Sequence, residues 1–342
     1  MEWILYIIYA LIVIMLLVVL HEFGHFIVGY KSGIKINEFS VGFGPKIVSK
    51  VKNGIKYSLR WLPLGGYVQF HGEDEEIEND PLAFNNAPIW KRFLTILAGP
   101  MMNIIVAIIF AIVVLSCYGD YDVYVGAVEE GSAVAQTGIM EGDHIIGVNG
   151  EGFDFYSEFY LDADEALNDD TITLDVERDG EEHSFTFEVA QNEQGQRGIP
   201  LGLQYERHRF GFFEAIGMSV KWIFLFLAQM FKVLFESVKN LDASQLSGFV
   251  GTSQVIGQTF ATGNFENIFR MASLLSLNLG IVNLLPFPAL DGGRLVFIII
   301  EKLRGKPVKR SIEGMVNFVG LVLLFGLMIL LTYQDLVRIF TG

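Results

Sequence analysis

The chain alternates long apolar stretches with polar segments that carry most of its charge. Four stretches contain about the 20 apolar residues that a helix needs to cross a lipid bilayer, and they occupy residues 3–30, 93–118, 271–290 and 315–333. We therefore predict four transmembrane helices. A fifth apolar stretch, residues 212–235, also carries Glu214, Lys221 and Lys232.

Lysine and arginine gather in two connecting segments, between the first two predicted helices and before the last one. Such segments stay in the cytoplasm, so both should lie on one side of the membrane. An even number of helices must then separate them, and the second and third helices supply two. We therefore expect residues 212–235 to form an amphipathic helix on the outer membrane surface; a re-entrant segment is the alternative. Both termini and residues 119–211 should be extracytoplasmic.

The outer segment is acidic and its pattern indicates β-structure. Apolar and polar residues alternate over residues 171–189, with a break at Asp179-Gly180, so we expect a two-stranded hairpin there. Its acidic side chains are typical of a solvated surface.

The stretch before this hairpin resembles a PDZ domain of the bacterial protease type. The shared pattern is GSxAxxxGIxxGDxIxxVNG, and the matching positions are Gly131, Ser132, Ala133, Gly138, Ile139, Gly142, Asp143, Ile145, Val148, Asn149 and Gly150. The resemblance implies a domain that captures extended peptides at the edge of a sheet. A domain that only blocks access sterically is the alternative, and it stays open.

Composition excludes several classes of protein. Half of the residues are hydrophobic and the mean hydropathy is +0.42, which argues against a soluble globule. The net charge of −15 argues against a nucleic-acid binder, which needs clustered basic residues. The only cysteine, Cys117, excludes an intrachain disulfide and a cysteine metal cluster. No lysine or arginine precedes the first apolar run, so we expect that run to be retained rather than cleaved as a signal peptide.

Candidate chemistry lies at the end of the first apolar run, in the sequence His21-Glu22-Phe23-Gly24-His25. Positions i and i+4 of a helix share a face, so both imidazoles can bind one metal ion. This is the H-E-x-x-H pattern of zinc peptidases, in which the glutamate acts as general base. A pair of buried, hydrogen-bonded histidines is the alternative. Polar groups inside a membrane are costly and are functional by default, which favours the metal site.

A catalytic zinc ion usually takes three protein ligands. Cys117 lies at the outer end of a predicted helix, and the other histidines fall in loops or in the outer segment. The best third ligand is Asp291, which follows Pro286 and Pro288 and precedes two glycines. Prolines exclude a regular helix there, and such irregular backbone is tolerated at membrane depth only beside protein or a cavity. A helix cap at the membrane surface is the alternative role for Asp291.

Taken together, these motifs resemble the bacterial site-2 protease family, intramembrane zinc metalloproteases of the regulator of sigma-E protease type. The resemblance covers nearly the whole chain and rests on H-E-x-x-H, LPLGGYV at 62–68, GPMMN at 99–103, the PDZ pattern, and NLGIVNLLPFPALDGG at 278–293. One departure is Phe249, which stands in the sequence LSGFVGT (246–252) where the family has proline. Some members also carry two PDZ domains, and only one fits here.

The resemblance implies a role for each matching residue. His21, His25 and Asp291 would bind Zn²⁺, with Glu22 as general base. Asn278 and Asn283 would line the site, where they would hold the substrate backbone or polarise the scissile carbonyl. The alternative is that they only make interhelical hydrogen bonds. The residues Gly65, Gly66 and Tyr67 would belong to a β element that pairs with the unwound substrate, and Asn103, Pro286 and Pro288 would support the site.

We thus expect a polytopic α-helical membrane protein with four transmembrane helices and an inserted extracytoplasmic PDZ domain of α+β class. The expected parts are 1–118 (two transmembrane helices and a cytoplasmic β loop), 119–208 (PDZ), 209–265 (amphipathic surface region) and 266–342 (two transmembrane helices). Its expected location is the bacterial plasma membrane. Its expected substrates are transmembrane proteins, such as anti-sigma factors or remnant signal peptides. A non-catalytic membrane PDZ scaffold with a structural metal is the rival hypothesis, and a transporter with a metal in its core is a second one.

Overall fold

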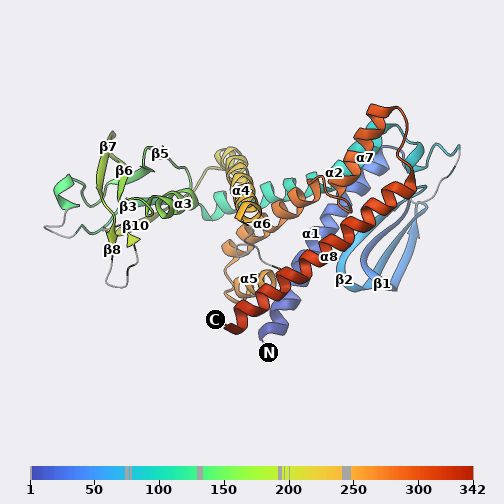
Figure 1. The fold of residues 1–342 in the computed structure, drawn as a ribbon, viewed down its shortest axis with the longest axis horizontal. Helices are drawn as coiled ribbons and strands as arrows, with labels where there is room; N and C mark the ends of the chain where they lie inside the picture. The colour runs from blue at the N-terminus through green and yellow to red at the C-terminus, as the bar shows by residue number, and fades with distance from the viewer. Residues whose placement is uncertain are drawn as a thin grey trace. The chain divides into compact units, whose positions relative to one another are not determined.

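The computed structural model describes residues 2–73, 77, 79–128, 134–191, 195, 197–199, 201–240 and 248–341. The chain divides into two units, one made of Met1–Ala111 and Ile223–Gly342 and the other of Ile112–Trp222. Figure 1 traces the elements of both units from the N-terminus to the C-terminus. The first unit holds most of the long helices and a two-stranded hairpin, and the second holds a β-sheet.

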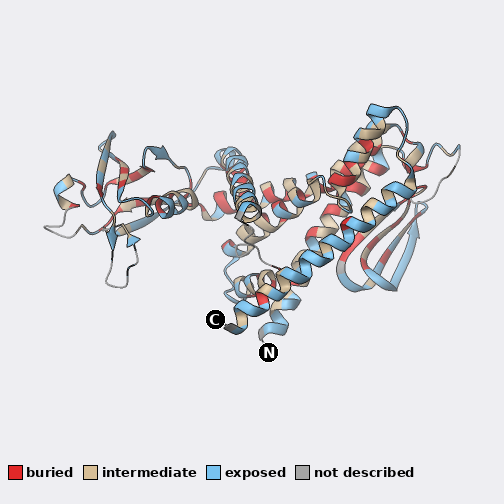
Figure 2. Cartoon of the chain, viewed as in Figure 1, coloured by how far each residue is buried: buried red, intermediate tan, exposed pale blue. Residues whose placement is uncertain are grey.

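Five helices in the described part of the chain are long and apolar enough to cross a membrane. They are α1 (Glu2–Lys31), α2 (Ile89–Val113), α4 (Phe212–Asn240), α6 (Phe265–Leu284) and α8 (Arg310–Thr341). Many of their large apolar side chains are exposed, and Figure 2 shows α8 as mostly exposed along its length. Apolar surface of this extent suits lipid rather than water. The predicted spans 3–30 and 315–333 lie within α1 and α8, and the predicted span 93–118 runs through α2 and the π-helix η2 (Val114–Tyr118) that follows it.

The predicted third span, 271–290, is wrong in its limits. The helix α6 begins at Phe265, where the Asn264 side chain caps it by accepting the Glu266 N–H at 2.9 Å, and it ends at Leu284. An irregular segment with Pro286 and Pro288 follows, because proline cannot continue the hydrogen-bond ladder. The next helix, α7 (Asp291–Arg304), begins at Asp291. The prolines thus interrupt the helical structure immediately before this aspartate, as the sequence predicted.

Small residues bring α1, α2 and α6 together. On α6, the hydroxyl groups of Ser273 and Ser276 donate hydrogen bonds to the α2 carbonyls of Ala107 (2.7 Å) and Asn103 (2.8 Å). On α1, a Cβ at Gly24 would stand 2.3 Å from the Ala98 carbonyl of α2. Small and hydroxyl residues are the usual means of close helix packing in membranes. These contacts fix the position of the α1 segment that carries the two histidines.

A long hairpin, β1 (Ile36–Lys52) and β2 (Ile55–Phe70), connects α1 to α2. Its turn is Asn53-Gly54, both with positive φ, as a tight two-residue hairpin turn requires. The hairpin curls, so β1 residues 38–41 pair with residues 56–59 of β2 on one side, and β1 residues 36–41 pair with residues 66–70 on the other. The last stretch of β2 is therefore an edge. It also runs beside α1, with Gly65 near Val18 and Gly66 near Glu22.

The second unit is built on an antiparallel sheet of strand order β10-β3-β4-β6-β7, with β5 paired to β4. Its elements are β3 (Asp120–Val125), β4 (His144–Val148), β5 (Glu151–Gly152), α3 (Tyr156–Ala166), β6 (Thr171–Arg178), β7 (Glu181–Glu188) and β10 (Leu203–His208), with a small pair, β8 (Ala190–Gln191) and β9 (Arg197–Gly198). The predicted hairpin at 171–189 is confirmed as β6 and β7, with positive φ at Asp179 and Gly180. Apolar residues of α3 and of the sheet form the core.

Asp143 of the PDZ-like pattern is buried and forms an ion pair with Arg178 of β6 at 2.6 Å. Burial alone would raise the pKa of the Asp143 carboxyl, but this pair and the Met140 N–H lower it below its usual value. The predicted positions Gly131, Ser132 and Ala133 lie outside the described residues, as do Leu246 and Ser247 of the LSGFVGT stretch. The remainder of that stretch, from Phe249, begins α5 (Phe249–Ala261).

Candidate metal centre

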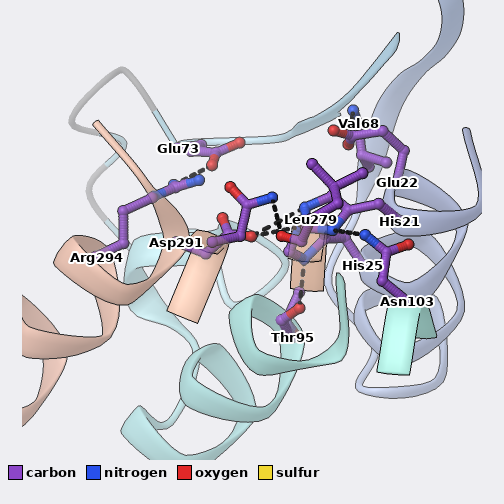
Figure 3. Close-up of polar contacts among 11 residues, drawn as sticks. His21, Glu22, His25, Val68, Glu73, Thr95, Asn103, Leu279, Asp291 and Arg294 are labelled. Atoms are coloured by element: carbon purple, nitrogen blue, oxygen red, sulfur yellow. Dashed lines mark hydrogen bonds and ion pairs between the residues drawn. The ribbon is translucent and has the colours of Figure 1, made fainter. Parts of the chain in front are cut away.

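The two histidines of α1 lie on one face of the helix, one turn apart. Their Nε2 atoms are 3.2 Å apart, and both side chains are buried. Figure 3 shows both rings beside Asp291, which belongs to α7. The helix forms here because residues 3–20 are a long apolar run, and it brings the imidazoles to the same level as the start of α7.

Asp291 completes a triangle with the two imidazoles. Its Oδ2 atom lies 3.0 Å from Nε2 of His21 and 3.2 Å from Nε2 of His25. Three ligands of a tetrahedral zinc ion, each about 2.0–2.1 Å from the metal, are separated by about 3.3 Å. The observed spacing fits that geometry. These three residues are the only group of metal-binding side chains found within the described ranges of the chain.

The neighbouring helix α2 fixes the orientation of both rings. Nδ1 of His25 lies 2.8 Å from the carbonyl oxygen of Thr95 on α2, so Nδ1–H can donate and Nε2 is left for the metal. Nδ1 of His21 lies 3.3 Å from Nδ2 of the buried Asn103. Oδ1 of Asn103 has no hydrogen-bond partner among the described residues. Turned to face the ring, it would accept the Nδ1–H of a metal-binding His21.

Glu22 lies next to the triangle and contacts the edge of β2. Its Oε2 atom accepts a hydrogen bond from the Val68 backbone N–H at 3.1 Å (Figure 3). Its Cγ would lie 3.7 Å from a Cβ placed on Gly66. The carboxylate is thus oriented by the strand and remains apart from the three candidate ligands.

The predicted β element is confirmed as the last part of β2. Gly65 has φ of +137°, a conformation that favours glycine, and a Cβ at Gly66 would lie 2.6 Å from the Ser40 carbonyl. The hydroxyl of Tyr67 accepts a hydrogen bond from Nη2 of Arg60 at 2.7 Å. The glycines therefore allow β2 to lie close to both β1 and α1.

Arg60 also forms an ion pair with Glu38 of β1 at 2.7 Å, and Lys56 adds a second pair at 3.3 Å. Burial alone would raise the pKa of Glu38, but hydrogen bonds from its neighbours, including these two, lower it to about 2. These contacts connect β1 to β2 and hold Arg60 against the Tyr67 hydroxyl.

The two candidate asparagines of α6 occupy different surroundings. Asn283 is half-buried in the last turn and donates from Nδ2 to the Leu279 carbonyl at 2.9 Å. Asn278 is exposed and lines a hollow of about 470 Å³ between α5 and α6, on a different side of α6 from Ser276 and Gly280, which face α2. The structure therefore does not place Asn278 against the histidine pair.

The segment with Pro286 and Pro288 is held by α8. The Ala289 N–H donates to Oδ1 of Asn317 at 3.1 Å, and Ala289 adopts a positive φ of 73°. A Cβ on Gly320 would stand 2.5 Å from Cβ of Pro288. The last helix thus fixes the strained segment that precedes Asp291.

Sequence reasoning missed two charged residues near the centre, Glu73 and Arg294. They form an ion pair, and Arg294 stands three residues after Asp291 on α7 (Figure 3). Only that i, i+3 spacing could have indicated Arg294. Both residues line a cavity of about 1090 Å³ that also borders Val68 and Gln69 of β2.

Comparison with protein families matches residues 9–327 to "Peptidase family M50". A protein from Agrobacterium fabrum named as a zinc metalloprotease is 31% identical, over 97% of this chain and 95% of its own. The "Regulator of sigma-W protease RasP" of Bacillus subtilis is 28% identical, over 95% of this chain and 96% of its own. The "Zinc metalloprotease RasP" of Geobacillus kaustophilus has the same identity and coverage.

Proposed function

The chain belongs to peptidase family M50, the site-2 proteases, and is a zinc metalloprotease; we propose that it cuts peptide bonds within transmembrane segments of other proteins. The observation that carries this proposal is the triangle of His21, His25 and Asp291, whose ligand atoms lie 3.0–3.2 Å apart, with a strand-bound Glu22 beside it. A structural metal site needs no such base.

In this proposal His21, His25 and Asp291 hold Zn²⁺. Bound there, the ion lowers the pKa of water and polarises the carbonyl of the peptide bond. Glu22 accepts a proton from the attacking water and passes it to the leaving amine. The Thr95 carbonyl and Asn103 keep the imidazoles in orientation.

A transmembrane helix satisfies its own backbone hydrogen bonds, so it must unwind before it can be cut. The free edge of β2 at residues 66–70 offers replacement hydrogen bonds to an extended substrate. We assign this role to Gly65, Gly66 and Tyr67. The Asn283 amide donates one N–H to the Leu279 carbonyl and has a second N–H, which we assign to a carbonyl of the substrate.

The proposal retains the predicted topology. Four helices span the plasma membrane, α4 lies on its outer surface, and the acidic second unit is an extracytoplasmic PDZ domain that docks or gates substrates. The name of the Bacillus subtilis relative, a regulator of sigma-W protease, supports a membrane substrate linked to sigma-factor control, such as an anti-sigma factor. Remnant signal peptides are the second candidate substrate.

The test uses the purified full-length chain in detergent with a single-span model substrate. Native protein, Glu22→Gln and a chelator-treated sample are compared, and the zinc content of each is measured. We expect only the native protein to cut, within the span, while Glu22→Gln retains about one zinc per chain. Zinc retention with cleavage that does not depend on Glu22 would contradict the proposal. No cleavage across a panel of trimmed substrates would favour the non-catalytic PDZ scaffold.

A further inference from the structure

Two carboxylates of the chain itself already accept hydrogen bonds from the edge of β2 that faces away from β1. The Val68 N–H donates to Glu22 at 3.1 Å, and the Phe70 N–H donates to Oε2 of Glu73 at 3.2 Å. Residues two apart in a strand direct their backbone groups to the same edge. These two N–H groups therefore lie on the edge that the substrate needs. Glu22 belongs to the catalytic chemistry, whereas Glu73 has no role in it.

Glu73 is held in this position from two sides. Its Oε1 forms an ion pair with Arg294 of α7, and its backbone carbonyl accepts a hydrogen bond from Nδ2 of Asn85 at 3.0 Å. The Glu73 side chain is 12% exposed. Its carboxylate thus connects the edge of β2 to the helix that begins with Asp291 (Figure 3).

Beside this edge lies the cavity of about 1090 Å³. Its lining includes Val68, Gln69, Glu73 and Arg294. Pockets of about 300–1,000 Å³ hold whole drug-sized ligands, so this one has room for several residues of extended chain. It continues along β2 from Val68, next to Glu22, toward the end of the strand, which lies against the cytoplasmic half of α1 near Gly29.

We propose that Glu73 is a removable cap on the substrate-binding edge of β2. An extended flank of the substrate displaces the Glu73 carboxylate from the Phe70 N–H and enters the cavity, and Arg294 holds the cap in place when no substrate is bound. This inference rests on the proposed function. It identifies the cavity as the site of the cytoplasmic flank of the substrate, and it makes Glu73 a positioning residue that opposes binding rather than a catalytic one.

The test compares Glu73→Ala and Glu73→Gln with native protein on the same single-span substrate, with KM and kcat measured separately. Removing the cap should lower KM by about tenfold, the effect of one hydrogen bond to a charged group, and leave kcat and zinc content unchanged. Glu73→Gln retains an acceptor for the Phe70 N–H but loses the charge, so its KM should fall less. Lys302→Ala is the control, because Lys302 is an exposed charged residue of α7 outside the cavity lining and should leave KM unchanged.

A second readout needs no turnover. In zinc-loaded Glu22→Gln protein with Cys117→Ser, an added mild oxidant can join a Gln69→Cys thiol to a cysteine in the substrate flank as a disulfide, since Gln69 is exposed to the cavity. Glu73→Ala should increase this cross-link at limiting substrate. An unchanged or higher KM together with an unchanged cross-link would overturn the cap. If Glu73→Ala loses zinc, the KM and the cross-link of Glu73→Gln are used in its place. Loss of Glu22-dependent cleavage in the native protein would instead contradict the proposed function.

Discussion

The backbone N–H of Val68 donates a hydrogen bond to the carboxylate of Glu22 across 3.1 Å. This contact joins an edge strand to Glu22, the proposed general base on α1, although the two residues are 46 positions apart in the chain. A carboxylate held by a backbone donor has a fixed direction, which a general base needs. The same strand is the proposed binding edge for the substrate, so substrate and base share one scaffold.

Val68→Pro tests this contact. Proline removes the N–H but is tolerated on the free edge of a sheet, so pairing with β1 should survive. We expect kcat to fall by about tenfold or more, because hydrogen bonds to charged groups contribute about 1.5–3 kcal/mol. Val68→Ala retains the N–H and should stay near native activity. Equal kcat values for the two variants would contradict the orienting role.

Gly99 on α2 leaves room for His25. A Cβ at Gly99 would stand 2.2 Å from Nε2 of His25, so Gly99→Ala must displace the imidazole from the candidate metal position. We expect zinc affinity to fall by about 100-fold or more, beyond the usual effect of losing a supporting hydrogen bond. The control is Gly326→Ala on α8, where nothing lies within 4 Å of the added methyl group. Competition with a chelator measures both, and native zinc affinity in Gly99→Ala would exclude this geometry.

Asn103 is the candidate partner of His21. It is completely buried, and its amide faces Nδ1 of the ring at 3.3 Å. Asn103→Leu should lower zinc affinity by about 10–100-fold, because the ring loses the group that fixes its orientation. Asn103→Asp retains an acceptor for Nδ1–H and should bind zinc more tightly than Asn103→Leu. Equal affinities of the two variants in chelator competition would assign Asn103 a packing role only.

The clustering of the three candidate metal ligands was largely predictable because its main pattern is local. An i, i+4 histidine pair lies on one face of any helix, and Pro286 and Pro288 indicated a break just before Asp291. The limits of the third helix were harder, because the apolar residues continue to Leu290 while proline ends the helix at Leu284. The end of this helix is therefore set by the missing N–H of proline and not by where the apolar run ends.

The supporting contacts were beyond sequence reasoning for a physical reason. The group that orients His25 is the backbone carbonyl of Thr95, and a backbone atom has no sequence signature. Glu73 and Arg294 are 221 positions apart in the chain, and only the tertiary fold brings them together. The direction of Asn278 depends on the packing of α5, which hydrophobic periodicity alone does not give.

The cluster around Glu38 predicts a dependence of stability on acid. The pKa of Glu38 is lowered from 4.5 to about 2 in the folded protein, so its contribution to stability is complete above 4.5 and is lost as the pH falls toward 2. Thermal unfolding in detergent should therefore show native protein losing more stability than Glu38→Gln between about pH 5 and pH 2. Parallel curves for the two proteins would mean that the ion pairs with Arg60 and Lys56 contribute nothing measurable.

Asp335 of α8 acts as a cap for a different helix. Its carboxylate is buried, and it accepts the N–H groups of Gly248 at 3.2 Å and Gly251 at 2.8 Å, at the start of α5. A Cβ on either glycine would lie within 3.0 Å of an oxygen atom of Asp335. The glycines thus allow the carboxylate to approach, and its negative charge suits the N-terminus of a helix.

Asp335→Ala should therefore destabilise the protein by about 2–4 kcal/mol, because it leaves two backbone N–H groups without an acceptor. Asp335→Asn retains one good acceptor atom and should lose about half as much, since the charge is gone but one hydrogen bond remains. Hydrogen exchange at Gly248 and Gly251 in the full-length protein reports the effect locally, with thermal unfolding as the global measure. Gly251→Ala gives an independent check, since its methyl group would displace the carboxylate without removing it. Native exchange rates at both glycines in Asp335→Ala would show that α5 begins there for another reason, such as the packing of Gly257 against Tyr6 of α1.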